Sequence, residues 1–334
     1  MSFRMLAVTA MMLVACGRAD RQVGDHEAPA ETQSSDRVTV GYDMAEASLR
    51  WIELVATGAS TEVLHEAFMR EVAPTAGCQA IVRHWARFRD WDDEIFYAFI
   101  LEALDHRATD RPLLDENGHP TPLGHARRLW SAARRDPERL RANLEALQSA
   151  DIRDAALEKA RRYLPAEADV SNQFHVVLFG ASNAFSVGDD NGFDLLQLET
   201  HADGTIDVER VIDLFAHEMH HSGLSSAMER HLGDTADDKR IMLPGVLVAE
   251  GLATFYTTPP FPHLEEWRES DDPAERELAS DWDRHLASLP ELYARASTDI
   301  ELGLSGELAT GDLVTRWLGG RQGPAYGLGV DMVR

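Results

Sequence analysis

The sequence DVERVIDLFAHEMHHSG, residues 207–223, is the stretch from which the fold can be worked out. It predicts a helix, because no proline or glycine interrupts it before Gly223, where we expect the helix to end. At about 100° per residue, His221 lies only about 40° around the helix axis from His217, one turn further along. Both imidazoles can therefore reach one metal ion. Glu218 lies about 100° from His217, where its carboxylate can contact a water on that ion.

A third metal ligand must come from elsewhere, because catalytic zinc sites use three protein ligands and keep one position for water. Glu250, in the apolar segment PGVLVAEGLATFY of residues 244–256, is the best candidate. Pro244 can begin a helix there, and a lone carboxylate in a buried helix needs a partner. That partner is a metal ion or, alternatively, a buried arginine, unless Glu250 lies at the surface. The other candidates are polar residues of the intervening connection: His231, Asp234, Asp237 and Asp238.

The segment His217-Glu-Met-His-His221 followed by Glu250-Gly-Leu-Ala resembles the gluzincin metallopeptidases, and within them zinc-dependent peptidases of uncharacterised bacterial secreted families. The resemblance covers about residues 173–256. It implies a zincin-like fold, Zn²⁺ as the cofactor held by His217, His221 and Glu250, and a peptide or protein substrate. Thermolysin-like enzymes have an aspartate four residues after the glutamate, whereas this chain has Thr254.

The resemblance also implies a reaction in which Glu218 takes a proton from a zinc-activated water and returns it to the leaving amine. His220 is either an outer partner of the metal site or a plain helix residue. The oxyanion of the reaction needs a further donor. Four residues of later segments remain open as that donor: Tyr326, Tyr256, His263 and His285.

Two other classes of function fit the same residues. The first is a zinc-containing lipoprotein that acts as a non-catalytic binding or scaffold module. The second is a zinc hydrolase of non-peptide amides or esters. Glu218 favours an enzyme over a scaffold, because structural zinc sites normally have four protein ligands and no use for an uncoordinated base.

The charge balance excludes nucleic acid as a partner. The chain has 57 acidic and 32 basic residues, a formal net charge of -25, so its surface field repels phosphate backbones. The sequence carries no signal for an oligomeric state.

The N-terminal residues predict a lipid anchor. Residues 1–15 combine one arginine with an apolar run that is too short to span a bilayer but right for a signal peptide. The run closes with Leu13-Val-Ala-Cys16-Gly17, which resembles the lipobox of bacterial lipoproteins. Cys16 is then the lipidated first residue, and residues 16–37 are a flexible tether. We therefore expect a protein of the cell envelope, anchored in the lipid bilayer on the periplasmic or outer-membrane face.

The remaining sequence predicts an α+β, mainly α fold with two regions. Residues 38–165 form a helical region, because apolar residues recur there at three- and four-residue spacing. Residues 166–334 form a zincin-like domain, in which a small antiparallel or mixed sheet accompanies the motif helix. The strands are expected at FHVVLF, residues 174–179, and FDLLQL, residues 193–198, which glycines and aspartates bound.

Overall fold

The chain is described here by a computed structural model. It describes residues 37–86, 91–105, 107, 110–114, 121–181, 184–198, 200–201, 203–233, 239–258, 263–270, 273–318 and 323–334. The expected signal peptide, Cys16 and the tether up to residue 36 lie outside the described residues, as do the alternative ligands Asp234, Asp237 and Asp238. None of the helices in the described part of the chain has both the length and the apolar character needed to cross a membrane.

The described residues form two compact units that alternate along the chain. The first unit comprises Val38–Arg153 and Asn172–Val211, and the second comprises Asp154–Ser171 and Ile212–Arg334. The sequence-based division at residue 165 stays a prediction. Both units are rich in helices and the first holds a small mixed sheet, so the expected α+β, mainly α class is confirmed.

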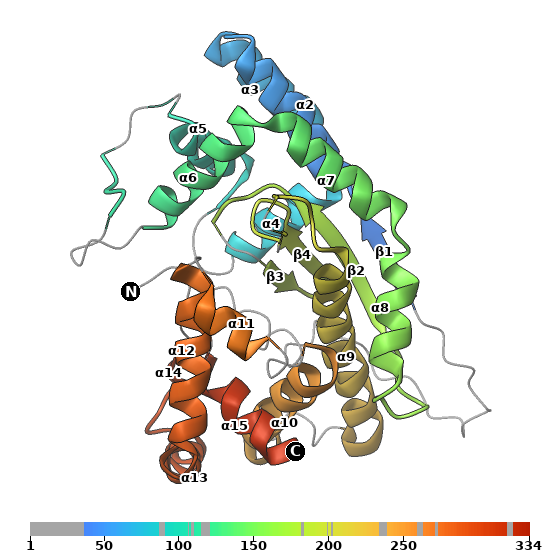
Figure 1. Ribbon diagram of the computed structural model, residues 1–334, viewed down its shortest axis with the longest axis vertical. Helices are drawn as coiled ribbons and strands as arrows, with labels where there is room; N and C mark the ends of the chain where they lie inside the picture. The colour runs from blue at the N-terminus through green and yellow to red at the C-terminus, as the bar shows by residue number, and fades with distance from the viewer. Residues whose placement is uncertain are drawn as a thin grey trace. The chain divides into compact units, whose positions relative to one another are not determined.

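The first unit combines a four-stranded sheet with most of the helices of the N-terminal half (Figure 1). The strand order is β1-β2-β4-β3, with β2 and β4 parallel and β3 and β4 antiparallel. Its elements are β1 Arg37–Gly41, α2 Asp43–Ala56, α3 Thr61–Ala67, the π-helical turn η1 Phe68–Val72, α4 Ala76–Ala86, α5 Asp93–Ala103, α6 Pro122–Arg135, α7 Pro137–Ser149, β2 Ser171–Val177, β3 Ala184–Val187 and β4 Asp190–Asp194.

Helix starts in this unit follow from side-chain caps. Asp136 accepts a hydrogen bond from the amide of Arg139, and Pro137 occupies the first helical position of α7. The apolar residues that follow at helical spacing are all buried: Leu140, Leu144 and Leu147. Most of the described residues between 38 and 165 lie in helices, whereas strand β1 was not expected there. The bounds of the helical region stay a prediction.

The strand expected at residues 193–198 is wrong in position, because β4 ends at Asp194. The buried carboxylate of Asp194 accepts hydrogen bonds from the amides of Phe179, Gly180 and Leu196. These bonds hold the chain in a turn directly after β4 and prevent it from continuing as a strand. The other expected strand is β2, shifted toward the N-terminus by three residues at its start.

The second unit is helical and contains both segments from which metal ligands were expected. Its elements are the greater part of α8 Ile152–Arg161 and of α9 Val208–Leu232, followed by α10 Lys239–Thr257, α11 Leu264–Glu269, α12 Pro273–Ala287, α13 Leu289–Ser305, α14 Thr310–Leu318 and α15 Pro324–Val333.

Two expected helix boundaries are wrong. Helix α9 does not end at Gly223 but continues to Leu232. A Cβ at Gly223 would lie 2.4 Å from Cδ1 of Leu164, so the glycine makes room for a packed side chain instead of ending the helix. Helix α10 begins at Lys239, and Pro244 lies inside it.

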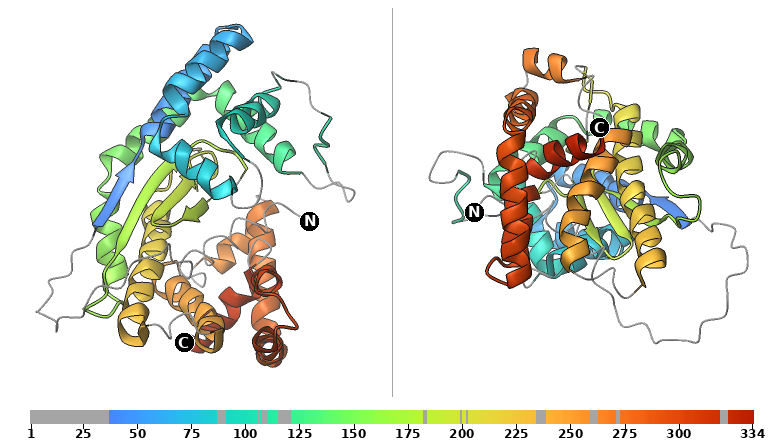
Figure 2. Two further views of the ribbon diagram at one scale, coloured as in Figure 1. Left: turned by 180° about the vertical axis from the view of Figure 1, so that it is seen from behind. Right: turned by 90° about the horizontal axis from the view of Figure 1, so that it is seen from below.

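Helices α10 and α15 cross with their backbones in contact (Figures 1 and 2). A Cβ at Gly251 would lie 2.1 Å from the carbonyl oxygen of Gly329, and a Cβ at Gly329 would lie 2.3 Å from that of Leu247. Any side chain at either glycine would push the two helices apart. The residue beside this crossing is Glu250, so the crossing positions the expected third ligand.

Candidate metal centre

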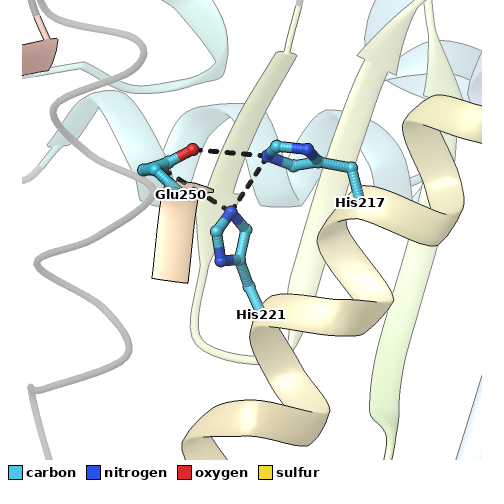
Figure 3. Close-up of side chains that lie close together, drawn as sticks. All are labelled: His217, His221 and Glu250. Carbon is cyan, nitrogen blue, oxygen red and sulfur yellow. Dashed lines mark hydrogen bonds and ion pairs between the residues drawn. The ribbon is translucent and has the colours of Figure 1, made fainter. Parts of the chain in front are cut away.

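Two helices of the second unit bring His217, His221 and Glu250 together (Figure 3). The two histidines lie one turn apart on α9 and turn their Nε2 atoms to the same side, 3.0 Å from each other. Glu250 faces them from α10, with Oε2 3.4 Å from Nε2 of His217 and Oε1 3.5 Å from Nε2 of His221. The structure therefore places the two motif histidines and the expected third residue around one point.

The dimensions and chemistry of this cluster fit zinc. Tetrahedral zinc with bonds of about 2.0–2.2 Å separates its ligand atoms by roughly 3.3–3.6 Å, and the three distances here are 3.0, 3.4 and 3.5 Å. Imidazole and carboxylate are both common zinc ligands. Oε2 of Glu250 is buried and accepts no hydrogen bond within the described residues, so a cation would satisfy it.

His217 and Glu250 are buried and His221 is half-buried, and their charges act strongly on one another. Burial would raise the pKa of Glu250, but the charges of His221 and His217 outweigh it and lower that pKa to about 2. Burial would lower the pKa of His221, but the carboxylates of Glu250 and Glu218 raise it to about 9. In the metal-free protein, a proton on His221 therefore balances the charge of Glu250.

Glu218 lies beside the three clustered residues and is 6% exposed. Its position next to His217 on α9 turns it to the adjacent side of the helix, as the helical spacing predicted. Burial raises the pKa of its carboxyl above the ordinary value, although the neighbouring imidazoles counteract this effect. A carboxylate with a raised pKa can both take and return a proton near neutral pH.

Tyr326, one of the four open oxyanion donors, is subject to the charges of both Glu250 and Glu218. Burial raises the pKa of its hydroxyl well above the ordinary value, and the charges of Glu250 and Glu218 raise it further. Tyr326 lies on α15, the helix that crosses α10 at Gly251. The hydroxyl therefore shares the field of both carboxylates.

The three other open donors have different surroundings. The ring of Tyr256 stacks on Tyr163, with 3.9 Å between the ring centroids. His263 stacks on Trp267 at the start of α11. His285 on α12 is buried. Its burial lowers its pKa, and the positive charge of Arg284 lowers that pKa further.

The two remaining histidines of α9 are separate from the three-residue cluster. His231 pairs with Glu167 at 2.8 Å on the exposed end of the helix. His220 is fully buried, and burial lowers its pKa to about 3, so it is neutral. Nδ1 of His217 lies instead within hydrogen-bond distance of Thr258, whose Oγ1 is 3.4 Å away.

Thr258 was not expected from the sequence. It lies eight residues after Glu250, in the run Thr-Thr-Pro-Pro that is typical of a helix end. Helical periodicity alone could have placed it near the face of Glu250, because eight residues rotate the helix by about 80° beyond two full turns. Its contact with His217 depends on how α9 and α10 pack, which the sequence does not reveal.

The chain belongs to the family described as "Putative zinc dependent peptidase (DUF5700)", whose model matches residues 72–302. The matched range contains His217, Glu218, His221, Glu250 and Thr258. No curated protein and no solved structure was found to match the chain. Together with the three-residue cluster, the family identifies zinc as the cofactor.

We expect zinc binding to release about one proton per chain at pH 7, because His221 carries a proton there and zinc binds only the neutral imidazole. At pH values below the His221 pKa of about 9, each further decrease of one pH unit should lower the apparent zinc affinity roughly tenfold, because the proton competes with zinc for the same nitrogen. Titration calorimetry in buffers with different heats of ionisation counts the released protons.

Zinc binding at pH 7 without proton release would contradict this account. In metal-free Glu250→Gln, the pKa of His221 should fall, because the carboxylate that chiefly raises it is gone. An NMR titration of the imidazole protons measures that shift.

Proposed function

We propose that this chain is a gluzincin-type zinc metallopeptidase that hydrolyses peptide bonds. The observation that carries the proposal is the convergence of two imidazoles from one helix and a buried carboxylate from another, at zinc-like distances, beside a further buried carboxylate. A purely structural zinc site would leave Glu218 without a role. Membership in a family of zinc-dependent peptidases supports the same substrate class.

In this proposal His217, His221 and Glu250 hold zinc, which supplies Lewis-acid polarisation and acidifies a water when bound. Two neutral imidazoles and one carboxylate leave a net positive charge on the site. Helices α9 and α10 fix these side chains before substrate arrives, so their geometry requires little rearrangement during the reaction.

Glu218 moves the proton. Its carboxylate takes a proton from the attacking water and delivers it to the nitrogen of the leaving amine as the peptide bond breaks. The burial that raises its pKa suits both steps, because the group must accept a proton and then release it.

Tyr326 donates a hydrogen bond to the oxyanion that forms on the substrate carbonyl. The raised pKa of its hydroxyl keeps the proton on the oxygen, as a donor requires. The contact between Gly251 and Gly329 supports this role, because it ties the helix of Tyr326 to the helix of Glu250.

The anchor proposal concerns the N-terminus. We propose that the sulfur of Cys16 is lipidated, that residues 1–15 are then removed, and that residues 16–37 tether a zincin-like catalytic domain to the envelope membrane. The order of apolar run, small residue and cysteine supports it. Mass spectrometry of the N-terminal peptide from the membrane fraction should show Cys16 as the first residue, carrying acyl chains. An N-terminal peptide that starts before Cys16 or carries no lipid would contradict this.

Glu218→Gln should retain about one zinc per chain and lose peptide hydrolysis by at least about 100-fold in kcat/KM, because the amide cannot accept the proton. Cleavage of a peptide library, followed by mass spectrometry, measures the activity. The matched control is Glu209→Gln, which removes an exposed carboxylate from the first turn of the same helix and should leave cleavage unchanged.

Undiminished cleavage by Glu218→Gln would defeat the proposed mechanism. A wild type that binds zinc but cleaves no peptide would favour the scaffold or the non-peptide hydrolase instead. Amide and ester model substrates distinguish those two.

Tyr326→Phe should lower kcat by about 100- to 1,000-fold with little change in KM or in bound zinc, because an oxyanion donor acts mainly in the transition state. The phenyl ring keeps the packing of α15, so the fold should persist. The control is Tyr256→Phe, whose ring remains stacked on Tyr163 and whose kcat should stay within about threefold of wild type. Equal effects of the two substitutions would remove Tyr326 from the mechanism.

A further inference from the structure

The imidazole of His217 lies between a side chain of α10 and the side chain of the residue that directly follows this helix. Its Nε2 is 3.4 Å from Oε2 of Glu250, the contact drawn in Figure 3. Its Nδ1 is 3.4 Å from Oγ1 of Thr258, a long hydrogen bond. Glu250 lies on α10 and Thr258 directly follows its last residue, so one continuous segment contacts both nitrogens of a ring carried by α9.

Thr258 is held in place by the end of α10. Helix α10 ends at Thr257, and the amide of Thr258 still donates a hydrogen bond to the carbonyl of Thr254, at 3.1 Å. This bond continues the helical pattern by one residue, so Thr258 keeps a fixed position relative to Glu250. The backbone bond thus places Thr258 one residue beyond α10, with the His217 ring between its side chain and that of Glu250.

A neutral imidazole has one N–H and one lone pair, so the partner of one nitrogen decides the role of the other. The Nε2 lone pair must be free to bind a cation, which requires the proton on Nδ1. Oγ1 of Thr258 is the acceptor within reach of that proton.

We propose that Thr258 is the positioning residue that fixes the tautomer and the ring orientation of His217 through its neutral hydroxyl. The inference rests on the proposed ligand set and adds the outer partner of one ligand. A hydroxyl adds no charge to the site, whereas a carboxylate at this place would make the histidine a more basic ligand and remove the net positive charge. Thr258 therefore sets a moderate zinc affinity and preserves the electrophilic character of the centre.

The experiment measures zinc affinity of the intact chain by competition with a chelator of known affinity. Thr258→Val keeps the shape of the side chain but removes the acceptor, and should weaken zinc binding by about 10- to 100-fold. Thr258→Ser restores the hydroxyl and should bind within about threefold of wild type. Thr258→Asp offers a charged acceptor and should bind zinc more tightly than wild type.

The matched control is Thr257→Val. The hydroxyl of Thr257 donates to the carbonyl of Ala253 in its own helix, so its loss tests the helix end without touching His217. Thermal unfolding of the metal-free variants gives a second readout. If Thr258 served only to stabilise the end of α10, both valine variants would have a lower unfolding midpoint, and their zinc affinities would equal each other.

Wild-type zinc affinity in Thr258→Val, or an equal loss of affinity in Thr257→Val, would overturn the inference. Weaker zinc binding in Thr258→Asp would overturn it as well, because a carboxylate is the stronger acceptor for Nδ1–H. These outcomes do not depend on hydrolysis. The proposed peptidase function would instead be contradicted by peptide cleavage that is undiminished in Glu218→Gln, or by a wild-type protein that cleaves no peptide.

Discussion

A carboxylate buried against two imidazoles is the constraint on which the second unit depends. Glu250 is 3% exposed and lies in the apolar middle of α10, where an unpaired charge would be very costly. The charge is balanced by a proton on His221 or by a divalent cation between the same atoms. The packing of α9 against α10 therefore depends on the chemistry of the site, because the two helices pack closely only when a proton or a cation balances the charge of Glu250.

The neighbouring elements hold the two ligand helices in place. Residues 154–171 run along α9 and are tied to it by ion pairs of Lys159 with Asp213 and of Arg230 with Asp169. On the other side of α10, the glycine contact admits α15 close to the backbone of Glu250. Each ligand helix thus has its own support, and neither relies on a disulfide, because Cys78 is buried as a free thiol. Rigid support of this kind keeps metal ligands within their narrow distance limits.

The sequence predicted the parts of the site that depend on local periodicity. His217, Glu218 and His221 follow from helix geometry, and Glu250 was found because a lone carboxylate in an apolar helix needs a partner. The open oxyanion donors could not be separated, since only packing brings Tyr326 near both carboxylates. The predicted ends of strands and helices were wrong where tertiary contacts determine them. Asp194 ends a strand by accepting hydrogen bonds from backbone amides, and Gly223 continues a helix because it makes room for Leu164.

The contact of Gly251 with Gly329 joins segments that are far apart in the sequence, and this has a consequence for the timing of activity. Contacts of high sequence separation form late in folding, because the intervening chain must first be ordered. A partly synthesised chain that lacks α15 has no Tyr326 beside Glu250. The surroundings of Glu250 are therefore complete only after α15 docks, so the last helix of the chain sets the time at which the centre is fully assembled.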